Sequence, residues 1–338
     1  MRIGTVGTGR IVDEFLNALK DVENAQCVAV YSRKEETARK LADKHQVKRI
    51  YTDYNSLLSD ESIDFIYIAL PNSLHYDYAL MALEKGKNVI CEKPFTSTVK
   101  ETKKLVNLAK EKHLFLFEAI TTLNFPNYEV IKESLSQLGA IKLVQCNYSQ
   151  YSSRYDQLLE GEVTNIFSPE FSGGCLVDIN IYNLHFVTGL FGKAKEVRYF
   201  SNKADNGIDT SGIVILRYDD FLCTCTGAKD SESPSFIVIQ GTKGYIKVNT
   251  PPSRALSFEI KTKDQMKVYE QDTKINRMTY EIRNFYKLYQ TKNYQKCYEL
   301  LEHSLKVVET AAQARKAAGI VFTADTLDKE DVLHKTPN

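Results

Sequence analysis

The tetrapeptide Cys91-Glu92-Lys93-Pro94 is the segment of this sequence whose residue types are best suited to catalysis. It follows a short apolar run, Asn88-Val89-Ile90, which predicts a β-strand. Proline has a fixed φ angle and restricts the residue before it, so Lys93 is expected to be a cation held in place at a strand end. An ammonium group in such a position can act as an acid or donate a hydrogen bond to a substrate oxygen.

A glycine turn near the start of the chain supplies a second chemical feature. The segment Gly7-Thr8-Gly9-Arg10-Ile11 lies between a strand-like run and an amphipathic helical pattern, which is the context of a dinucleotide-binding fingerprint. Gly7 permits the tight turn, and Gly9 lets the backbone approach a pyrophosphate at the helix N-terminus. Val12 stands where the fingerprint has Gly or Ala, but we favour a dinucleotide site over a turn without a ligand. Together with Lys93, the turn indicates nicotinamide chemistry on a sugar-like or carbonyl substrate.

The end of the second predicted strand, Tyr31-Ser32-Arg33, bears on the choice of cofactor. An acid at this point would bind the adenosine ribose 2′-hydroxyl of NAD, whereas Ser32 and Arg33 offer a donor and a cation that suit a 2′-phosphate. We therefore expect NADP in preference to NAD. The alternative is a helix N-cap followed by a surface arginine.

The segment Leu70-Pro71-Asn72-Ser73-Leu74-His75 follows another predicted strand. Cofactors lie at the carboxyl ends of parallel strands, although Asn72 or Ser73 could instead simply cap the next helix. The candidate cofactor contacts in this region and at the lysine tetrapeptide are Leu70, Pro71, Asn72, His75, Glu92 and Lys93.

A predicted helix after Gly173-Gly174 carries two polar residues in an apolar setting, Asp178 and Tyr182. Residues four apart share a helix face, so their carboxylate and phenol are expected to project together into one cleft. Buried polar groups need partners, and a pair satisfied within the core is the alternative. For His185, one turn further, we favour a core or surface position over a catalytic one.

Predicted strands and helices alternate through residues 1–120, which indicates a Rossmann-type parallel sheet with right-handed crossovers. Beyond Asn124-Phe125-Pro126 the strands come in pairs joined by short turns, which is typical of an antiparallel sheet. We therefore predict an α/β protein with a dinucleotide-binding domain at 1–120 and a second α/β domain at 121–338. The expected strands are Arg2–Val6, Gln26–Tyr31, Phe65–Leu70, Asn88–Ile90, Leu114–Phe117, Ile141–Tyr151, Glu196–Ser201, Gly212–Tyr218, Phe221–Thr226, Phe236–Gln240 and Gly244–Val248.

Composition excludes several classes of partner. The 338 residues carry a net charge of +1, and without a basic stripe we expect no nucleic-acid partner. No apolar run approaches the roughly 18–20 residues that span a bilayer, and the N-terminus enters a strand without a signal-peptide pattern. The seven cysteines lack zinc-ligand spacing, so we expect no metal, reduced thiols and a cytoplasmic location.

These motifs together resemble the Gfo/Idh/MocA oxidoreductases. The resemblance runs in the family's order from the glycine turn through Pro71-Asn72-x-x-His75 and Glu92-Lys93-Pro94 to Gly173-Gly174-x-x-x-Asp178-x-x-x-Tyr182. Many members carry histidine where this chain has Tyr182, so it is more similar to the dihydrodiol dehydrogenase and glucose–fructose oxidoreductase branch. It departs from that branch at Thr121–Asn124, where bulkier aromatic or basic residues are expected.

The resemblance implies an N-terminal Rossmann domain and a C-terminal domain with a large, mainly antiparallel sheet that has one open face. In the family this face is often used for oligomerisation, so we expect a homodimer or homotetramer. An exposed apolar sheet face is costly on a monomer.

We expect an NAD(P)-dependent oxidoreductase that transfers a hydride between nicotinamide and a carbinol or carbonyl carbon of a sugar, a polyol or a related carbonyl compound. Lys93 would bind the reacting oxygen, and Asp178 would orient Lys93 or a substrate hydroxyl. Tyr182 would be the main proton donor or acceptor, with its pKa lowered by the ammonium group, although two coupled groups share the proton. The alternatives are a non-catalytic ligand sensor on the same fold and a reductase of a non-sugar substrate such as a diketone.

Overall fold

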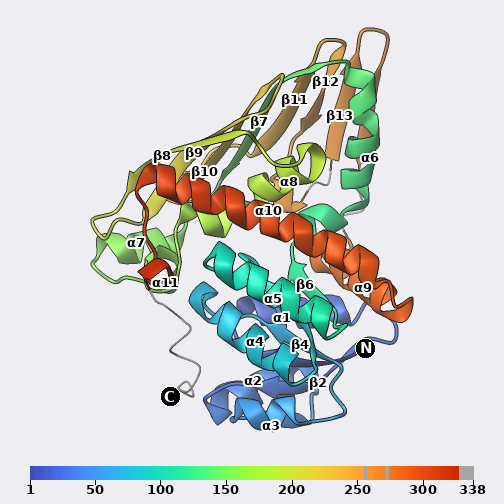
Figure 1. Ribbon diagram of the computed structural model, residues 1–338, viewed down its shortest axis with the longest axis vertical. Helices are drawn as coiled ribbons and strands as arrows, with labels where there is room; N and C mark the ends of the chain where they lie inside the picture. Colours follow the sequence, from blue (N-terminus) through green and yellow to red (C-terminus); the bar gives the residue numbers. More distant parts are fainter. Residues whose placement is uncertain (255–256, 271–273, 327–338) are drawn as a thin grey trace.

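Two β-sheets organise the chain (Figure 1). The computed structural model describes residues 1–254, 257–270 and 274–326. The first sheet has six strands in the order β3-β2-β1-β4-β5-β6, and all its strand pairs are parallel. The second sheet has eight strands in the order β14-β13-β12-β11-β7-β10-β9-β8. This is the predicted α/β architecture of a Rossmann sheet followed by a large, mainly antiparallel sheet.

The six-stranded sheet forms because its strands are short apolar runs with helices on both faces, the usual arrangement of a parallel sheet. Every residue of β4, for example, is buried. The sequence prediction lacked β3 and α3, since a three-residue strand and a five-residue helix leave almost no periodicity to detect. The elements are β1 Arg2–Val6, α1 Arg10–Leu19, β2 Gln26–Tyr31, α2 Glu35–His45, β3 Arg49–Tyr51, α3 Tyr54–Leu58, β4 Phe65–Ile68, α4 His75–Glu84, β5 Asn88–Glu92, α5 Val99–Glu111 and β6 Leu116–Ala119.

The strand order has its reversal point between β1 and β4, and the loops after these strands open at the carboxyl edge of the sheet. In sheets of this kind the crevice outside that edge is where ligands bind. The glycine turn follows β1 and the segment beginning at Leu70 follows β4, so both predicted cofactor loops meet at the reversal point.

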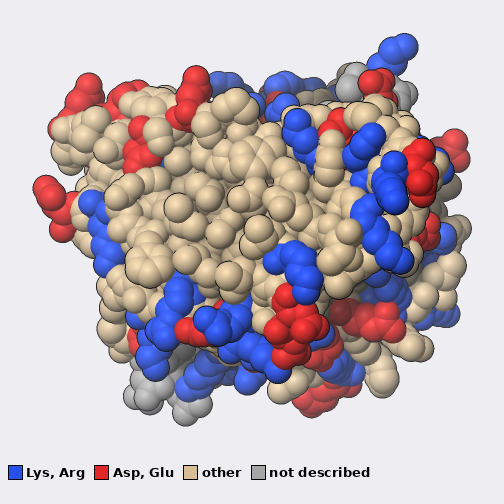
Figure 2. All heavy atoms as spheres, turned by 90° about the horizontal axis from the view of Figure 1, so that it is seen from above, with Lys and Arg blue, Asp and Glu red and all other residues tan. Residues whose placement is uncertain are grey.

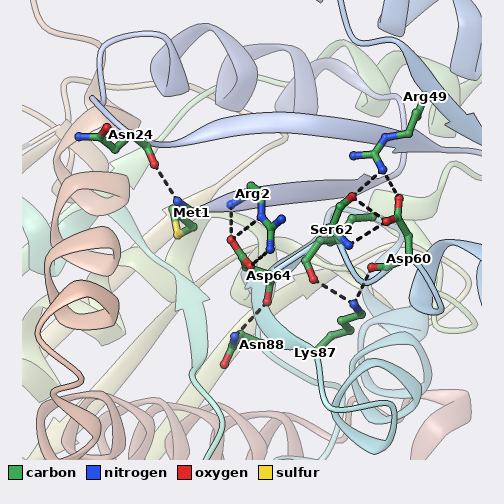
Figure 3. A network of polar contacts seen from close by, with 10 residues as sticks. Met1, Arg2, Asn24, Arg49, Asp60, Ser62, Asp64, Lys87 and Asn88 are labelled. Atoms are coloured by element: carbon green, nitrogen blue, oxygen red, sulfur yellow. Dashed lines mark hydrogen bonds and ion pairs between the residues drawn. The ribbon is translucent and has the colours of Figure 1, made fainter.

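The opposite, amino-terminal edge of the same sheet is held by a polar network (Figure 3). Arg2 donates from its backbone and its guanidinium group to the Asp64 carboxylate, and Asn88 donates to the Asp64 carbonyl oxygen at 2.9 Å. Arg49 binds Asp60 at 2.5 Å. These contacts join the starts of β1, β4 and β5, so charge pairing fixes one edge while the other edge stays open for a ligand.

The eight-stranded sheet is antiparallel except for the central pair β7 and β10, which run parallel. The prediction missed its last two strands, β13 and β14, in a region of few apolar residues. The remaining elements are α6 Pro126–Ser134, β7 Ile141–Ser149, α7 Ser153–Leu159, a π-helical turn at Leu176–Asn180, α8 Ile181–Phe191, β8 Glu196–Lys203, β9 Asp209–Arg217, β10 Leu222–Ala228, β11 Phe236–Gly241, β12 Gly244–Val248, β13 Ser257–Thr262, β14 Met266–Glu270, α9 Arg277–Gln290, α10 Tyr294–Ala318 and α11 Thr323–Thr326.

Helices cover one face of the eight-stranded sheet, and the other face is exposed. The inner face packs against α8 and α10, which lie between the two sheets (Figure 1). The outer face, seen in Figure 2, presents a broad area without charged side chains, bordered by charges. The large apolar side chains exposed on this face are Leu143, Phe200, Ile213, Leu222, Met266 and Val268. One face of the sheet is therefore open, as the resemblance implied.

The C-terminal helices tie the two sheets together. Helix α9 packs on α1, and α10 contacts α5 and β6 of the first sheet as well as β8 of the second. Chain beyond residue 120 thus contributes to the core around the first sheet, and the predicted domain boundary at residue 120 stays a prediction.

The structure bears on two expectations from composition, one about membrane-spanning segments and one about the cysteines. Among the helices in the described ranges, none is both long and apolar enough to cross a membrane. All seven cysteines are free thiols. Three of them, Cys146, Cys223 and Cys225, converge on the inner face of the second sheet with their sulfur atoms within 4.8 Å of one another, a grouping that sequence spacing did not reveal.

Candidate active site

A cleft of about 1110 Å³ runs from the glycine turn to the edge of the second sheet. All the predicted site residues line it except one, His75. The predicted residues that line the cleft are Gly7, Thr8, Gly9, Arg10, Ile11, Ser32, Arg33, Leu70, Pro71, Asn72, Glu92, Lys93, Asp178 and Tyr182.

The glycine turn has the geometry that a dinucleotide site requires. Gly7 has a φ of +110°, and a Cβ atom added there would lie 2.4 Å from the Ala69 carbonyl oxygen, so only glycine fits. A Cβ atom at Gly9 would meet nothing within 4 Å, which leaves the backbone open to the cleft. No side chain caps the N-terminus of α1, so its free N–H groups can receive a phosphate.

Ser32 and Arg33 lie at the far end of the cleft. The Ser32 hydroxyl pairs with Thr37 at 2.7 Å and accepts from the Lys34 N–H at 3.3 Å, so it shapes the turn that enters α2. Arg33 is exposed. This arrangement leaves a cation at the predicted position of the adenosine ribose.

His75 does not line the cleft, but it contacts the two loops that carry the lining residues Lys93 and Leu70. Its side chain is buried, with Nδ1 2.9 Å from the Pro94 carbonyl oxygen and Nε2 2.9 Å from that of Leu70. The imidazole therefore bridges the two loops that carry Lys93 and Leu70. The prediction of direct cofactor contact finds no geometric support, because a helix start turned this side chain inward.

Asn72 does not cap the next helix, which was the alternative considered from the sequence. Its amide donates to the Ser172 carbonyl oxygen at 2.9 Å, across the cleft from its own loop. It therefore links the first sheet to the segment that leads into Asp178, and no side chain caps the N-terminus of α4.

Lys93 and Asp178 form a half-buried ion pair in the lining of the cleft, with 14% and 28% of their side chains exposed. The Lys93 ammonium donates to the Asp178 backbone oxygen at 2.7 Å and to its carboxylate Oδ1 at 3.0 Å. Burial by itself would lower the pKa of Lys93, but the Asp178 carboxylate and the Tyr182 hydroxyl raise it above its ordinary value. Asp178 thus orients Lys93, as predicted from the sequence, and keeps it protonated.

Lys229 is a second cation on Asp178, and sequence analysis missed it. Its ammonium lies 2.5 Å from Asp178 Oδ2, and its side chain is 9% exposed. Burial would raise the pKa of Asp178, but Lys93 and Lys229 lower it well below its usual range. Lys229 comes directly after β10, beside Gln150 at the end of β7, and only the parallel pairing of these strands reveals that they share the cleft.

Tyr182 lies against Lys93, with the ammonium nitrogen 5.1 Å from its ring centroid. Burial raises the pKa of Tyr182 more than the Lys93 and Arg277 charges lower it. The expectation of a lowered pKa was therefore wrong, because sequence spacing gives the neighbouring charge and not the degree of burial.

Arg277 and Glu14 are further residues of the cleft wall that the sequence did not single out. Arg277 donates to Glu14 at 3.1 Å, and Glu14 also accepts from Arg10 at 2.9 Å. The spacing of Arg10 and Glu14 on α1 was a signal for half of this network, but Arg277 is remote in sequence. His185, in contrast, is buried beside His303 and Glu118, which agrees with the core position favoured for it.

The helix that carries Asp178 begins where Asp209 binds it. The Asp209 carboxylate accepts from the Leu176 N–H at 2.6 Å and from the Tyr199 hydroxyl at 2.7 Å. Gly174 has a φ of +109°, and a Cβ atom there would lie 2.1 Å from Asp209 Oδ1. The first helical turn is π-helical, a rare form that is frequent at functional sites; the sequence predicted an uninterrupted helix.

The fold and the cleft define a dinucleotide-binding oxidoreductase of two sheets, with a lysine–carboxylate–tyrosine cluster beside the cofactor turn. Residues 1–120 match the model of an oxidoreductase family with an NAD-binding Rossmann fold, and residues 131–247 match the GFO/IDH/MocA C-terminal domain. The chain belongs to the GFO/IDH/MocA oxidoreductase family, which confirms the resemblance and the enzyme class expected from the sequence.

Named relatives agree with this assignment. The scyllo-inositol 2-dehydrogenase (NADP⁺) IolU of Bacillus subtilis is 36% identical, over 96% of this chain and 99% of that protein. The trans-1,2-dihydrobenzene-1,2-diol dehydrogenase of Danio rerio is 33% identical, over 73% of this chain and 74% of its own. The crystal structure of the 3-ketoreductase KijD10 from Actinomadura kijaniata, in complex with NADP and TDP-benzene, has the same fold, with a TM-score of 0.82, 21% identity and coverage of 94% and 97% of the two chains.

Replacement of Gly174 by alanine should destabilise the protein strongly, because the new Cβ atom would meet the Asp209 carboxylate. The matched control is Gly192→Ala at the other end of α8, where φ is also positive, +74°, and a Cβ atom would meet nothing within 4 Å. Both variants incur a left-handed backbone cost of roughly 1–2 kcal/mol, so the difference between their urea midpoints isolates the contact. Equal midpoints would show that Asp209 does not fix the helix start.

Proposed function

We propose that this protein is an NADP-preferring dehydrogenase or reductase of cyclic polyols or sugar-like hydroxy-carbonyl compounds. The observation that carries the proposal is the Lys93–Asp178–Tyr182 cluster, which lies in the same cleft as the glycine turn. A nicotinamide cofactor, when bound, would supply or accept the hydride. The chain supplies binding, orientation and the path of the proton.

The residues that would hold the cofactor are those around the glycine turn. The open backbone at Gly9 and the uncapped start of α1 suit a pyrophosphate. Arg33 suits a 2′-phosphate, because a guanidinium group binds phosphate with two parallel hydrogen bonds. The NADP named for two of the relatives supports the same choice.

Lys93 and Tyr182 have separate roles in this proposal. Lys93 stays protonated, since its pKa is raised, and donates a hydrogen bond to the reacting oxygen, where it stabilises developing negative charge. Tyr182 gives a proton to that oxygen in reduction and takes it in oxidation. Asp178 holds Lys93 in place by accepting two hydrogen bonds from its ammonium group, one at the backbone oxygen and one at carboxylate Oδ1.

Further polar side chains in the lining of the cleft suit a hydroxylated substrate. Tyr148, Gln150, Asn165 and Ser253 line the cleft, and their amide and hydroxyl groups can donate to and accept from alcohol oxygens. The inositol and dihydrodiol substrates in the names of relatives are consistent with such a wall.

We further propose that two copies of the chain pair through the outer face of the eight-stranded sheet, and that the protein works in the cytoplasm. The apolar residues exposed on that face, with Phe200 at 66% and Val268 at 63%, exceed what isolated surface residues require. The seven free thiols suit a reducing compartment.

Replacement of Tyr182 by phenylalanine should lower kcat by roughly 10²–10⁴, the usual size of a general acid–base contribution. Because its pKa is raised, Tyr182 is protonated at neutral pH, so oxidation of an alcohol should speed up as pH rises toward that pKa, and the variant should lose this limb. The assay follows nicotinamide absorbance with NADP⁺ and a panel of inositols, sugars and diols. Tyr151→Phe, which removes an exposed hydroxyl, is the control; an unchanged pH profile in Tyr182→Phe would remove Tyr182 from the chemistry.

Arg33→Ala should weaken NADPH binding by about tenfold or more, the loss of one charge-assisted hydrogen bond, and change NADH binding little. Fluorescence titration with both cofactors measures this. Arg39→Ala on α2, which removes an exposed guanidinium group paired with Glu35, should affect neither. Equal losses for both cofactors, or tighter NADH than NADPH in the unmutated protein, would contradict the proposed preference.

Two charges placed on the open sheet face should separate the proposed dimer or tetramer. Phe200→Asp combined with Leu222→Asp introduces like charges on the face that would be covered, where they would lose their hydration. Light scattering after size exclusion should show a dimer or tetramer for the unmutated chain and a monomer for the variant. Leu159→Asp, at an exposed residue of α7, should leave the assembly intact; a monomeric unmutated chain would refute the proposal.

A further inference from the structure

The ammonium of Lys229 has a positive charge and N–H donors that its ion pair with Asp178 does not fully use. Lys93 already balances the single negative charge of Asp178, so the added Lys229 ammonium gives the three groups a net charge of +1. Lys229 is only 7% exposed and lines the cleft. A buried ammonium costs free energy unless it is bound, and one carboxylate oxygen occupies one of its three N–H donors.

The neighbouring acid does not account for the remaining donors. The Asp230 carboxylate accepts from the Thr210 and Ser211 hydroxyls, each at 2.7 Å, and so has its own partners. The backbone of Lys229 is fixed on both sides, since its N–H donates to Thr210 at 2.9 Å and its carbonyl accepts from Ser152 at 3.0 Å. The backbone that carries the side chain is therefore fixed at the cleft, and among the described residues the Lys229 ammonium donates to Asp178 alone, which leaves two of its N–H donors for a ligand.

Lys93 and Lys229 bind the two oxygens of one carboxylate, Lys93 at Oδ1 and Lys229 at Oδ2. The two nitrogens therefore flank one carboxylate in the lining of the cleft, Lys93 from the end of β5 and Lys229 from the end of β10. Two donors held on one carboxylate can reach two oxygens of the same substrate, and oxygens on adjacent carbon atoms are the closest pair that a polyol offers. A substrate with a single hydroxyl could use only one of them.

We propose that Lys229 is a catalytic residue that binds a second substrate oxygen, on the carbon next to the reacting one, and so makes the enzyme selective for vicinal diols and α-hydroxy ketones. This deepens the proposed function and rests on it, because Lys93 is taken to bind the reacting oxygen. When the substrate is bound, Asp178 continues to hold both ammonium groups in position. The second substrate oxygen then replaces solvent beside Lys229.

The test compares trans-cyclohexane-1,2-diol with cyclohexanol, which lacks the second hydroxyl. The unmutated protein with NADP⁺ should show a kcat/KM for the diol at least tenfold above that for cyclohexanol. Lys229→Met should lower the ratio of the diol value to the cyclohexanol value by about 10- to 100-fold, the loss of one charge-assisted hydrogen bond made to the diol alone. The variant leaves Asp178 paired with Lys93, so no lone buried charge is created to prevent folding.

Lys110→Met is the matched control, because it also removes an ion pair of 2.5 Å, with Glu302, away from the cleft. It should preserve the preference for the diol. Equal losses for both alcohols in Lys229→Met would mean that Lys229 acts only through Asp178, and no loss for either would mean that it does not act at all; either result overturns the proposal.

A binding measurement separates this proposal from the proposed function. If neither alcohol is turned over while NADP⁺ still binds, the redox activity on such alcohols is contradicted. The diol should then still raise the melting temperature of the NADP⁺ complex of the unmutated protein more than cyclohexanol does, and Lys229→Met should abolish that difference. A Lys229→Gln variant repeats the measurement if the methionine variant fails to fold. Equal shifts for both alcohols in the unmutated protein overturn the role of Lys229.

Discussion

The cluster of Lys93, Asp178 and Lys229 is the interaction on which the rest of the site depends. Each charged group comes from a different part of the fold: the end of β5, the π-helical turn and the end of β10. Removing the Asp178 carboxylate would leave two neighbouring ammonium groups, largely shielded from solvent, without a counter-charge, which is destabilising in typical proteins. The cluster therefore holds the parallel sheet and the antiparallel sheet in one fixed relation, and the cleft between them takes its shape from that relation.

The surrounding backbone is built so that these charges can meet. Asp209 fixes the start of the helix that carries Asp178, and Gly174 gives the space for this contact. On the other side of the cleft, His75 bridges the carbonyl oxygens of Pro94 and Leu70. Asp209 and His75 do not line the cleft, but they act on it indirectly because they fix the segments that carry Asp178, Lys93 and Leu70.

The sequence predicted the parts of this site whose positions follow from local rules. A proline after Lys93, a glycine turn after a strand and the spacing of Asp178 and Tyr182 each have a meaning within a few residues. Lys93, the glycine turn, Asp178 and Tyr182 all line the cleft. Lys229 and Arg277 could not be found in this way, because their positions depend on strand pairing and on a C-terminal helix that packs back on α1. The fold was predictable to the level of two sheets, whereas β3, β13 and β14 lacked the long apolar pattern that reveals a strand.

The same cluster bears on how the proton is shared, which the sequence left open between Lys93 and Tyr182. Asp178 is paired with two cations, yet its carboxylate still raises the pKa of Lys93, so the ammonium has little tendency to lose a proton. Burial raises the pKa of Tyr182 and the Glu92 carboxylate adds to that rise, while the charges of Lys93 and Arg277 oppose it. Both pKa values are raised, so at neutral pH Lys93 is an ammonium and Tyr182 a phenol. Each can therefore donate a hydrogen bond to an oxygen in the cleft, but only Lys93 carries a positive charge that the neighbouring Asp178 carboxylate holds in place.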